Sequence, residues 1–141
     1  MIEETNRLVL GTAQLGMNYG VANTHGQPNI STARSLVKEA WKNGVRYFDT
    51  AQAYGQSEAV LGDTLQFAGI ESDARIISKT DPSVDVQDFS AFKASVEGSL
   101  DRLKVDQLWG IMLHREEQLI HWDVAIKEAF SCLRSEGRIL H

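Results

Sequence analysis

Short apolar runs alternate along the chain with longer segments in which apolar residues recur every three or four positions. The short runs are stopped by glycine or polar residues and are too short for helices, so they predict buried strands. These runs cover Arg7–Thr12, Val45–Phe48, Arg75–Lys79 and Leu108–Leu113. The longer segments are typical of helices with one buried face. The pattern therefore predicts strands that alternate with helices.

The predicted helices also have recognisable ends. Side chains that cap helix N-termini precede or open each segment, at Ser31, Ser57, Asp88 and Asp123. Glycines suited to a left-handed C-terminal residue follow three of them, at Gly44, Gly69 and Gly137. Apolar positions such as Leu36 in the first helix and Phe89 in the third are expected to face the core.

The alternation amounts to four strand–helix units, and Ile139–His141 resembles the beginning of a fifth strand. Such alternation predicts an α/β fold with a parallel sheet and right-handed connections. No linker or repeat divides the chain, so we expect a single unit over residues 1–141. The longest connection, Ala13–Ile30, is rich in Gly, Asn and Gln, and long loops of this kind are often functional.

Composition excludes several classes of protein. Apolar residues make up 43% of the chain and charged residues 23%, as in ordinary globular proteins. The net charge of −5 argues against a nucleic-acid partner. The longest apolar stretch, Leu108–Leu113, is far shorter than a membrane span, and Glu3 and Glu4 argue against a signal peptide. Since Cys132 is the only cysteine, it has no partner for an internal disulfide, and we expect a cytoplasmic protein.

Several familiar motifs are missing from the sequence. It lacks G-x-x-x-x-G-K-[ST], G-x-G-x-x-G, H-E-x-x-H and G-x-S-x-G. A metal site could be built from His114, Glu117, His121 and Asp123, but these spacings follow no compact ligand motif. We therefore expect no metal.

Titratable side chains follow three of the predicted strands. Asp49, Lys79 and His114 each stand at the C-terminal end of a strand, and Tyr54 lies five residues after Asp49. In barrels with this alternation, that end of the strands carries catalysis. We therefore expect these four side chains to converge.

Together, the four side chains suit proton transfer to a carbonyl oxygen. Tyrosine has a pKa of about 10, which a nearby ammonium lowers, and a carboxylate keeps that ammonium charged and oriented. A histidine donor beside them would help to stabilise a developing oxyanion. Each residue alone also has a purely structural explanation. Asp49 could bond backbone amides of its loop, and Tyr54 could be a half-buried packing residue. Lys79 could be solvated, and His114 could be hydrogen-bonded to a nearby carbonyl. Only the combination favours catalysis.

The sequence resembles the aldo-keto reductases at several segments. Residues 49–62 read D-T-A-Q-A-Y-G-Q-S-E-A-V-L-G, similar to the family signature D-T-A-x-x-Y-G-x-x-E-x-x-L-G. Residues 76–80 read I-I-S-K-T and resemble the strand that carries the family's lysine. Ser99–Leu103, followed by Asp106 and His114, resembles the S-L-x-R-L-x-x-D…H segment, and residues 10–12 resemble the first strand.

The resemblance implies the first half of a (β/α)8 TIM barrel, with four to five parallel strands alternating with four helices. It also implies an NADP-dependent oxidoreductase that reduces an aldehyde or ketone to an alcohol. Tyr54 would be the proton donor, tuned by Lys79 and Asp49, and His114 would orient the carbonyl. Gly11, Thr12 and Asp49 would contact the NADP cofactor, and the expected partner is a small carbonyl compound.

Two departures from the family pattern matter. Trp109 stands where the family often has a second aspartate, and we interpret it as packing. The loop Tyr19–Asn23, which reads Y-G-V-A-N, resembles that of a bacterial branch and is expected to border the substrate site, although ordinary loop packing explains it equally well.

The later strands, which carry most cofactor contacts in the family, are missing from these 141 residues. We therefore weigh a truncated reductase against a non-catalytic half-barrel that assembles through its open edges. We expect the isolated 141-residue chain to self-associate through those edges or to be poorly soluble.

Overall fold

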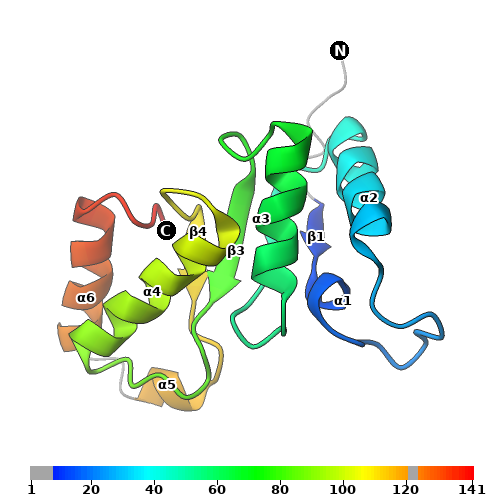
Figure 1. Cartoon of the computed structure of the whole chain (residues 1–141). Helices are drawn as coiled ribbons and strands as arrows, with labels where there is room; N and C mark the ends of the chain where they lie inside the picture. Colours follow the sequence, from blue (N-terminus) through cyan, green and yellow to red (C-terminus); the bar gives the residue numbers. More distant parts are fainter. Residues whose placement is uncertain (1–7, 121–123) are drawn as a thin grey trace.

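The computed structural model describes residues 8–120 and 124–141. Four parallel strands form one sheet in the order β1-β2-β3-β4 (Figure 1). Their bounds are β1 Val9–Gly11, β2 Tyr47–Asp49, β3 Arg75–Lys79 and β4 Gly110–Met112. Three of them lie inside the apolar runs that predicted them, β2 extends one residue beyond its run to Asp49, and the parallel α/β arrangement is confirmed.

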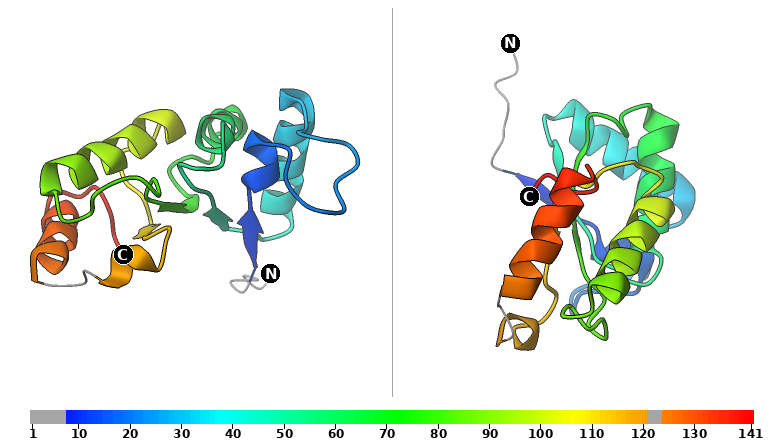
Figure 2. Two further views of the ribbon diagram at one scale, coloured as in Figure 1. Left: turned by 90° about the horizontal axis from the view of Figure 1, so that it is seen from below. Right: turned by 90° about the vertical axis from the view of Figure 1, so that its left-hand side faces the viewer.

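Helices connect the strands and cover one side of the sheet. Their bounds are α1 Ala13–Gly16, α2 Ile30–Lys42, α3 Ser57–Ala68, α4 Phe89–Leu103, α5 Glu117–Ile120 and α6 Val124–Ser135. Helices α2, α3, α4 and α6 are the four that the sequence predicted, and they follow one another around the convex side of the curved sheet (Figure 2). The short helices α1 and α5 lie in βα connections and were not predicted. Among residues 8–120 and 124–141, no helical layer covers the opposite, concave side of the sheet.

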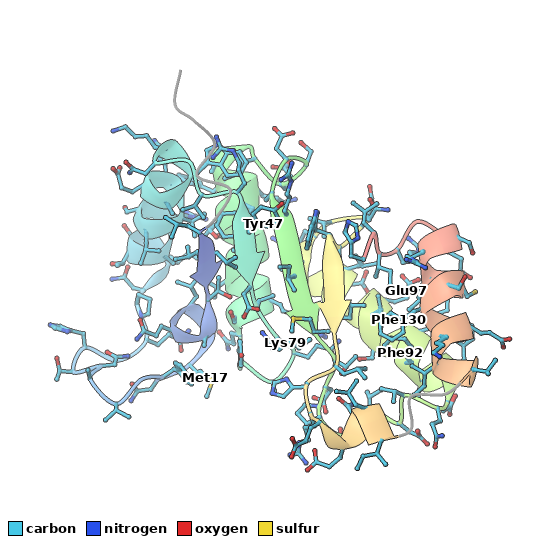
Figure 3. All side chains as sticks on the ribbon, turned by 180° about the vertical axis from the view of Figure 1, so that it is seen from behind. Met17, Tyr47, Lys79, Phe92, Glu97 and Phe130 are labelled. Atoms are coloured by element: carbon cyan, nitrogen blue, oxygen red, sulfur yellow. The ribbon has the colours of Figure 1, made fainter. Side chains whose placement is uncertain are left out.

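The two faces of the sheet differ in burial because successive strand residues point to opposite sides. Phe48, Ile76 and Ile111 point toward the helices and are buried in the main hydrophobic core. Tyr47 and Lys79 belong to the concave face, near opposite ends of the sheet (Figure 3). The concave face is thus the more exposed one, and it carries both polar and apolar side chains.

The segment after α6 continues the sheet beyond β4. Leu108 and Ile139 form a parallel bridge, and the backbone nitrogen of His141 donates to the Trp109 carbonyl at 3.0 Å. This agrees with the expected beginning of a fifth strand. The Trp109 ring meets Tyr47 edge to face, with 5.0 Å between ring centroids, so it packs on the concave side.

The helix starts differ in part from the sequence prediction. Asn29 caps α2, with its side chain accepting from the Thr32 nitrogen at 2.9 Å, so the prediction of Ser31 as the cap is wrong. Ser57 is the first residue of α3, but its hydroxyl is turned into the protein. Asp88 caps α4 as predicted. The predicted cap Asp123 lies outside the described residues.

Two positions on the predicted apolar faces are partly open to solvent. The side chains of Leu36 and Phe89 are exposed, whereas Val37 and Phe92 are fully buried. Leu36 lies beside the buried stripe of α2, and Phe89 is the first residue of α4. Within the described ranges, no helix combines the length and apolar character needed to cross a membrane.

Candidate active site

Three neighbouring strands bring the predicted catalytic residues to one end of the sheet. Asp49 is the last residue of β2, Lys79 is the last of β3, and His114 follows β4 by two residues. The register pairs Gly11 with Asp49 and Lys79 with Met112, so these strands end side by side. Tyr54 lies in the connection between β2 and α3.

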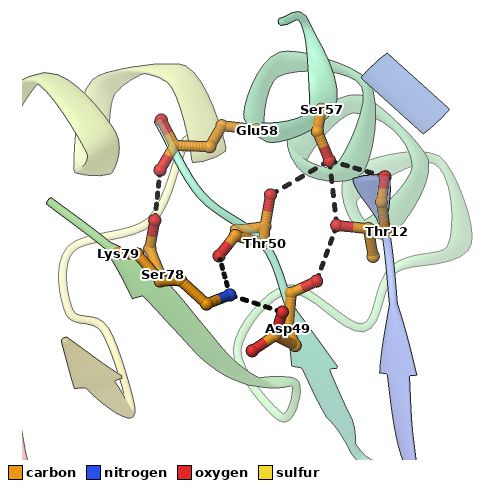
Figure 4. Close-up of polar contacts among 7 residues, drawn as sticks. All are labelled: Thr12, Asp49, Thr50, Ser57, Glu58, Ser78 and Lys79. Atoms are coloured by element: carbon orange, nitrogen blue, oxygen red, sulfur yellow. Dashed lines mark hydrogen bonds and ion pairs between the residues drawn. The ribbon is translucent and has the colours of Figure 1, made fainter. Parts of the chain in front are cut away.

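Lys79 and Asp49 form an ion pair at the strand ends. The lysine Nζ donates to Asp49 Oδ1 at 2.6 Å and to the Thr50 carbonyl at 3.1 Å (Figure 4). The lysine side chain is only 15% exposed, so its charge is held in a fixed place and is partly shielded from water. A fixed ammonium at this point acts electrostatically on the neighbouring phenol.

The Tyr54 ring lies between the lysine and the histidine. Lys79 Nζ is 5.0 Å from the centroid of the Tyr54 ring, and the His114 ring meets it edge to face at 6.0 Å. The ring of Tyr19 lies on it at 6.5 Å. The structure thus brings all four predicted residues together, and their chemical roles remain predictions.

His114 is held through its backbone. Its nitrogen donates to Gln118 Oε1 at 2.9 Å and to Thr80 Oγ1 at 3.3 Å. Within the described part of the chain, nothing hydrogen-bonds the Nδ1 atom of its ring, which is shielded from solvent. Because a buried N–H without an acceptor is costly, the proton of a neutral ring belongs on Nε2.

A close backbone approach fixes the Tyr54 loop. A Cβ added at Gly16 would lie 2.0 Å from the Ser57 nitrogen and 2.1 Å from the Tyr54 carbonyl oxygen. The Gly16 carbonyl in turn accepts from the Gln56 nitrogen at 3.1 Å. Only glycine fits at position 16, and this contact locks α1 against the start of α3.

A pocket of about 290 Å³ lies beside the tyrosine, on the side of β1. Its lining comes from the strand ends and α1: Gly11, Thr12, Ala13, Gln14, Tyr19, Asp49 and Tyr54. An added Cβ at Gly11 would meet no atom within 4 Å, so the space in front of this residue is open. Larger pockets lie elsewhere on the chain, but none of their lining residues belongs to the predicted site.

The hydroxyl of Thr12, a predicted cofactor contact, is used within the protein. Thr12 is fully buried, and its Oγ1 donates to the Asp49 carbonyl at 2.8 Å and lies 2.9 Å from Ser57 Oγ. This bond ties β1 to β2 behind the pocket. The Thr12 hydroxyl is therefore already hydrogen-bonded within the protein.

The sequence interpretation missed a buried polar layer beneath the site. Glu58 is 2% exposed, and its Oε2 accepts from Arg102 Nε at 2.7 Å. Its Oε1 accepts from Ser78 Oγ at 2.5 Å (Figure 4). A signal was available, because Glu58 shares its helical spacing with the buried Leu61 and Leu65. A carboxylate on that stripe had to be buried and paired.

Asp81 lies two residues after Lys79, in the turn that follows β3. Hydrogen bonds from the hydroxyl and the backbone nitrogen of Ser83 lower the pKa of Asp81 below its ordinary value. The charged carboxylate therefore holds the turn that follows β3.

The metal alternative has no support in the described residues. Within residues 8–120 and 124–141, no three His, Cys, Asp or Glu side chains are grouped to hold an ion. Two of its four ligands, His121 and Asp123, lie outside those ranges.

Comparisons with known proteins agree on one family. The sequence model described as "Aldo/keto reductase family" matches residues 7–141. The uncharacterized oxidoreductase YrpG of Bacillus subtilis (strain 168) is 29% identical over 151 residues, covering 95% of this chain and 43% of that protein.

Solved structures share the fold. The crystal structure of PA4992 from Pseudomonas aeruginosa, classed among the aldo-keto reductases, superposes with a TM-score of 0.75 at 29% identity, over 93% of this chain and 52% of that one. An aldo/keto reductase from Klebsiella pneumoniae, solved in complex with NADP and acetate, gives a TM-score of 0.68 at 24% identity over 93% and 42% of the two chains. The chain thus spans about half the length of the relatives it matches.

Proposed function

The chain belongs to the aldo/keto reductase family, and we propose that it supplies the catalytic half of an enzyme that reduces an aldehyde or ketone to an alcohol. The observation that carries this proposal is the position of the Lys79 ammonium, 2.6 Å from Asp49 and 5.0 Å from the Tyr54 ring centroid. The catalytic residues are Tyr54, Lys79, Asp49 and His114.

Tyr54 is the proton donor in this proposal. Its hydroxyl gives a proton to the carbonyl oxygen as that oxygen gains negative charge, which leaves a phenolate behind. The Lys79 ammonium stabilises that phenolate, because a fixed charge in a partly shielded site costs no reorganisation during the reaction. Asp49 keeps the lysine charged and in place.

His114 orients the substrate. With Nδ1 buried and unpaired among the described residues, Nε2 is the ring nitrogen available to donate to the carbonyl oxygen. Together with the Tyr54 hydroxyl, it would hold that oxygen from two sides. This arrangement aligns the carbonyl before the proton moves.

The proposed cofactor is NADP, which when bound in reduced form supplies the hydride for the carbonyl carbon. The open space at Gly11 and the neighbouring pocket suit the reactive end of a nicotinamide nucleotide. Asp49 and Thr12 line the same pocket. No arginine or lysine lines it, so the phosphates of the nucleotide require residues from another part of a complete barrel.

The test compares two tyrosine variants of the full reading frame that contains these residues. We expect Tyr54→Phe to lower kcat for aldehyde reduction by about 10²–10⁴-fold, the usual contribution of a general acid. NADP binding, measured by fluorescence titration, should largely survive. The control is Tyr47→Phe, which removes a hydroxyl that accepts from Arg75 at the opposite end of the sheet, and it should leave kcat within a few-fold.

Near wild-type turnover by Tyr54→Phe would remove Tyr54 from its role. A wild-type protein without any carbonyl reductase activity would instead favour the alternative of a non-catalytic assembly module. The observation that supports that alternative is the exposure of two apolar side chains, Val9 and Met112, on the concave side of the sheet.

A further inference from the structure

A buried glutamine joins the connections that follow β3 and β4. Gln118, on the short helix α5, is only 8% exposed, although its chain neighbours Glu117 and Leu119 are both exposed. Neither the sequence pattern nor the proposed chemistry uses it. Buried amides are expensive unless their hydrogen bonds are complete, so its contacts need an explanation.

The carboxamide oxygen of Gln118 holds the turn that carries His114. Oε1 accepts from the backbone nitrogens of His114 at 2.9 Å and Arg115 at 3.1 Å. It also accepts from Thr80 Oγ1 at 3.3 Å, and Thr80 is the fully buried residue that follows Lys79.

The carboxamide nitrogen of Gln118 holds the neighbouring loop. Nε2 donates to the carbonyl oxygens of Asp81 at 3.4 Å and Val84 at 3.3 Å. The backbone nitrogen of the same residue is held by Gln52, whose Oε1 accepts from the Asp81 nitrogen at 3.0 Å. Since Gln52 lies two residues before Tyr54, the two amides connect the loops of Tyr54, Lys79 and His114.

We propose that Gln118 is a positioning residue for His114. Its carboxamide sets the distance between the His114 turn and the loop after Lys79, and so places the imidazole against the Tyr54 ring. Only an amide does this, because the site demands an acceptor on one side and two N–H donors on the other. The kinetic test of this proposal rests on the proposed carbonyl reduction, whereas the test by the NMR signal of His114 does not.

The first variant is Gln118→Met, which keeps the length of the side chain and removes every hydrogen bond. We expect kcat for aldehyde reduction to fall by about 10–100-fold, since a small misplacement of a catalytic group costs on that order. KM for the nucleotide should stay within about 3-fold, because Gln118 is not among the residues that line the pocket beside Tyr54. The control is Glu117→Ala on the same helix, an exposed residue whose loss should leave kcat unchanged.

A double-mutant cycle separates positioning from general damage. In a His114→Asn background, Gln118→Met should lower kcat less than about 2-fold further, because a residue that acts through His114 has nothing left to position. An equal loss in both backgrounds would overturn the proposal. So would a Glu117→Ala effect as large as that of Gln118→Met.

A second variant and a second readout cover poor folding and absent activity. Thr80→Val keeps the shape of the side chain but removes the hydroxyl shared by Gln118 and His114. In either variant, the imidazole NMR signal of His114, assigned by its loss in His114→Asn, should shift or broaden while that of the exposed His25 does not. An unchanged His114 signal overturns the proposal even if the protein proves inactive, whereas inactivity with a changed signal overturns only the proposed function.

Discussion

Removing Arg102 should destabilise the protein more than removing the charge of its partner Glu58. The carboxylate of Glu58 is 2% exposed, whereas the Arg102 side chain is 45% exposed. Arg102→Met therefore leaves a buried charge with only Ser78 as a described side-chain partner, while Glu58→Gln leaves an arginine that water can solvate. The two substitutions break one interaction but have unequal costs.

The magnitude follows from this asymmetry. Removing one member of a fully buried pair costs about 3–5 kcal/mol of unfolding free energy. Because water reaches Arg102, we expect about 2–3 kcal/mol for Arg102→Met. Glu58→Gln keeps an acceptor oxygen and loses a charge-assisted bond, so it should cost about 1–1.5 kcal/mol. With Glu58→Gln already present, adding Arg102→Met should cost at least about 1 kcal/mol less than it does alone.

Urea denaturation followed by circular dichroism measures all three variants in the full reading frame, with the m-value as a check on two-state unfolding. Lys93→Met is the matched control, because Lys93 also lies on α4 and pairs with the partly exposed Glu136. It should leave the unfolding free energy nearly unchanged. Equal costs for Arg102→Met and Glu58→Gln, or strict additivity of the pair, would refute the reasoning.

Three further predictions follow from packing, ionisation and the open sheet. Gly62→Ala should cost more than about 2 kcal/mol of stability in thermal denaturation, because its Cβ would lie 2.4 Å from the Leu103 carbonyl oxygen. Gly98→Ala on α4 should cost less than Gly62→Ala, because the nearest atom to its Cβ, at 3.2 Å, belongs to the Arg102 side chain and not to the backbone. Ser83→Ala should raise the pKa of Asp81 in a carboxyl NMR titration, and an unchanged pKa would contradict the assigned cause. Because the pKa of Asp81 is lowered in the folded state, its carboxylate stabilises the fold at pH values above its ordinary pKa. This stabilisation is lost as the pH falls through the folded pKa. The 141-residue chain by itself should bind NADP weakly and self-associate through its concave face. Calorimetry measures the NADP affinity and light scattering the oligomeric state, and a monomer that binds NADP tightly would contradict the expectation.

The sequence predicted the strands and the converging side chains because both depend on short-range patterns. Short apolar runs bounded by glycine or polar residues located β1 to β4, and parallel strands place their C-terminal ends at one edge. Asp49 and Lys79 could be paired in advance because neighbouring parallel strands bring such ends together. The ion pair at 2.6 Å follows from that rule.

What the sequence could not predict depends on contacts between segments far apart in the chain. The cap of α2 is Asn29 and not Ser31, because the incoming chain determines which polar side chain reaches the first turn. Ser57 had the right residue type for a cap, but its hydroxyl is drawn inward by Thr12, which is 45 residues away. Gln118 gave no signal at all, because a lone glutamine in a polar loop has no periodicity to reveal its burial.

The alternation of strand residues explains how the helical layer supports the concave site. Asp49 and Lys79 face the open side, so their neighbours Thr50 and Ser78 must face the helices. Thr50 Oγ1 donates to Ser57 Oγ at 3.0 Å and Ser78 Oγ donates to Glu58, so both strands are held by the first turn of α3. The same turn follows directly on the loop of Tyr54, and a shift of α3 would therefore move the phenol, the ammonium and the carboxylate together. Substitutions beneath the sheet should for this reason alter catalysis as well as stability, although they touch neither substrate nor cofactor.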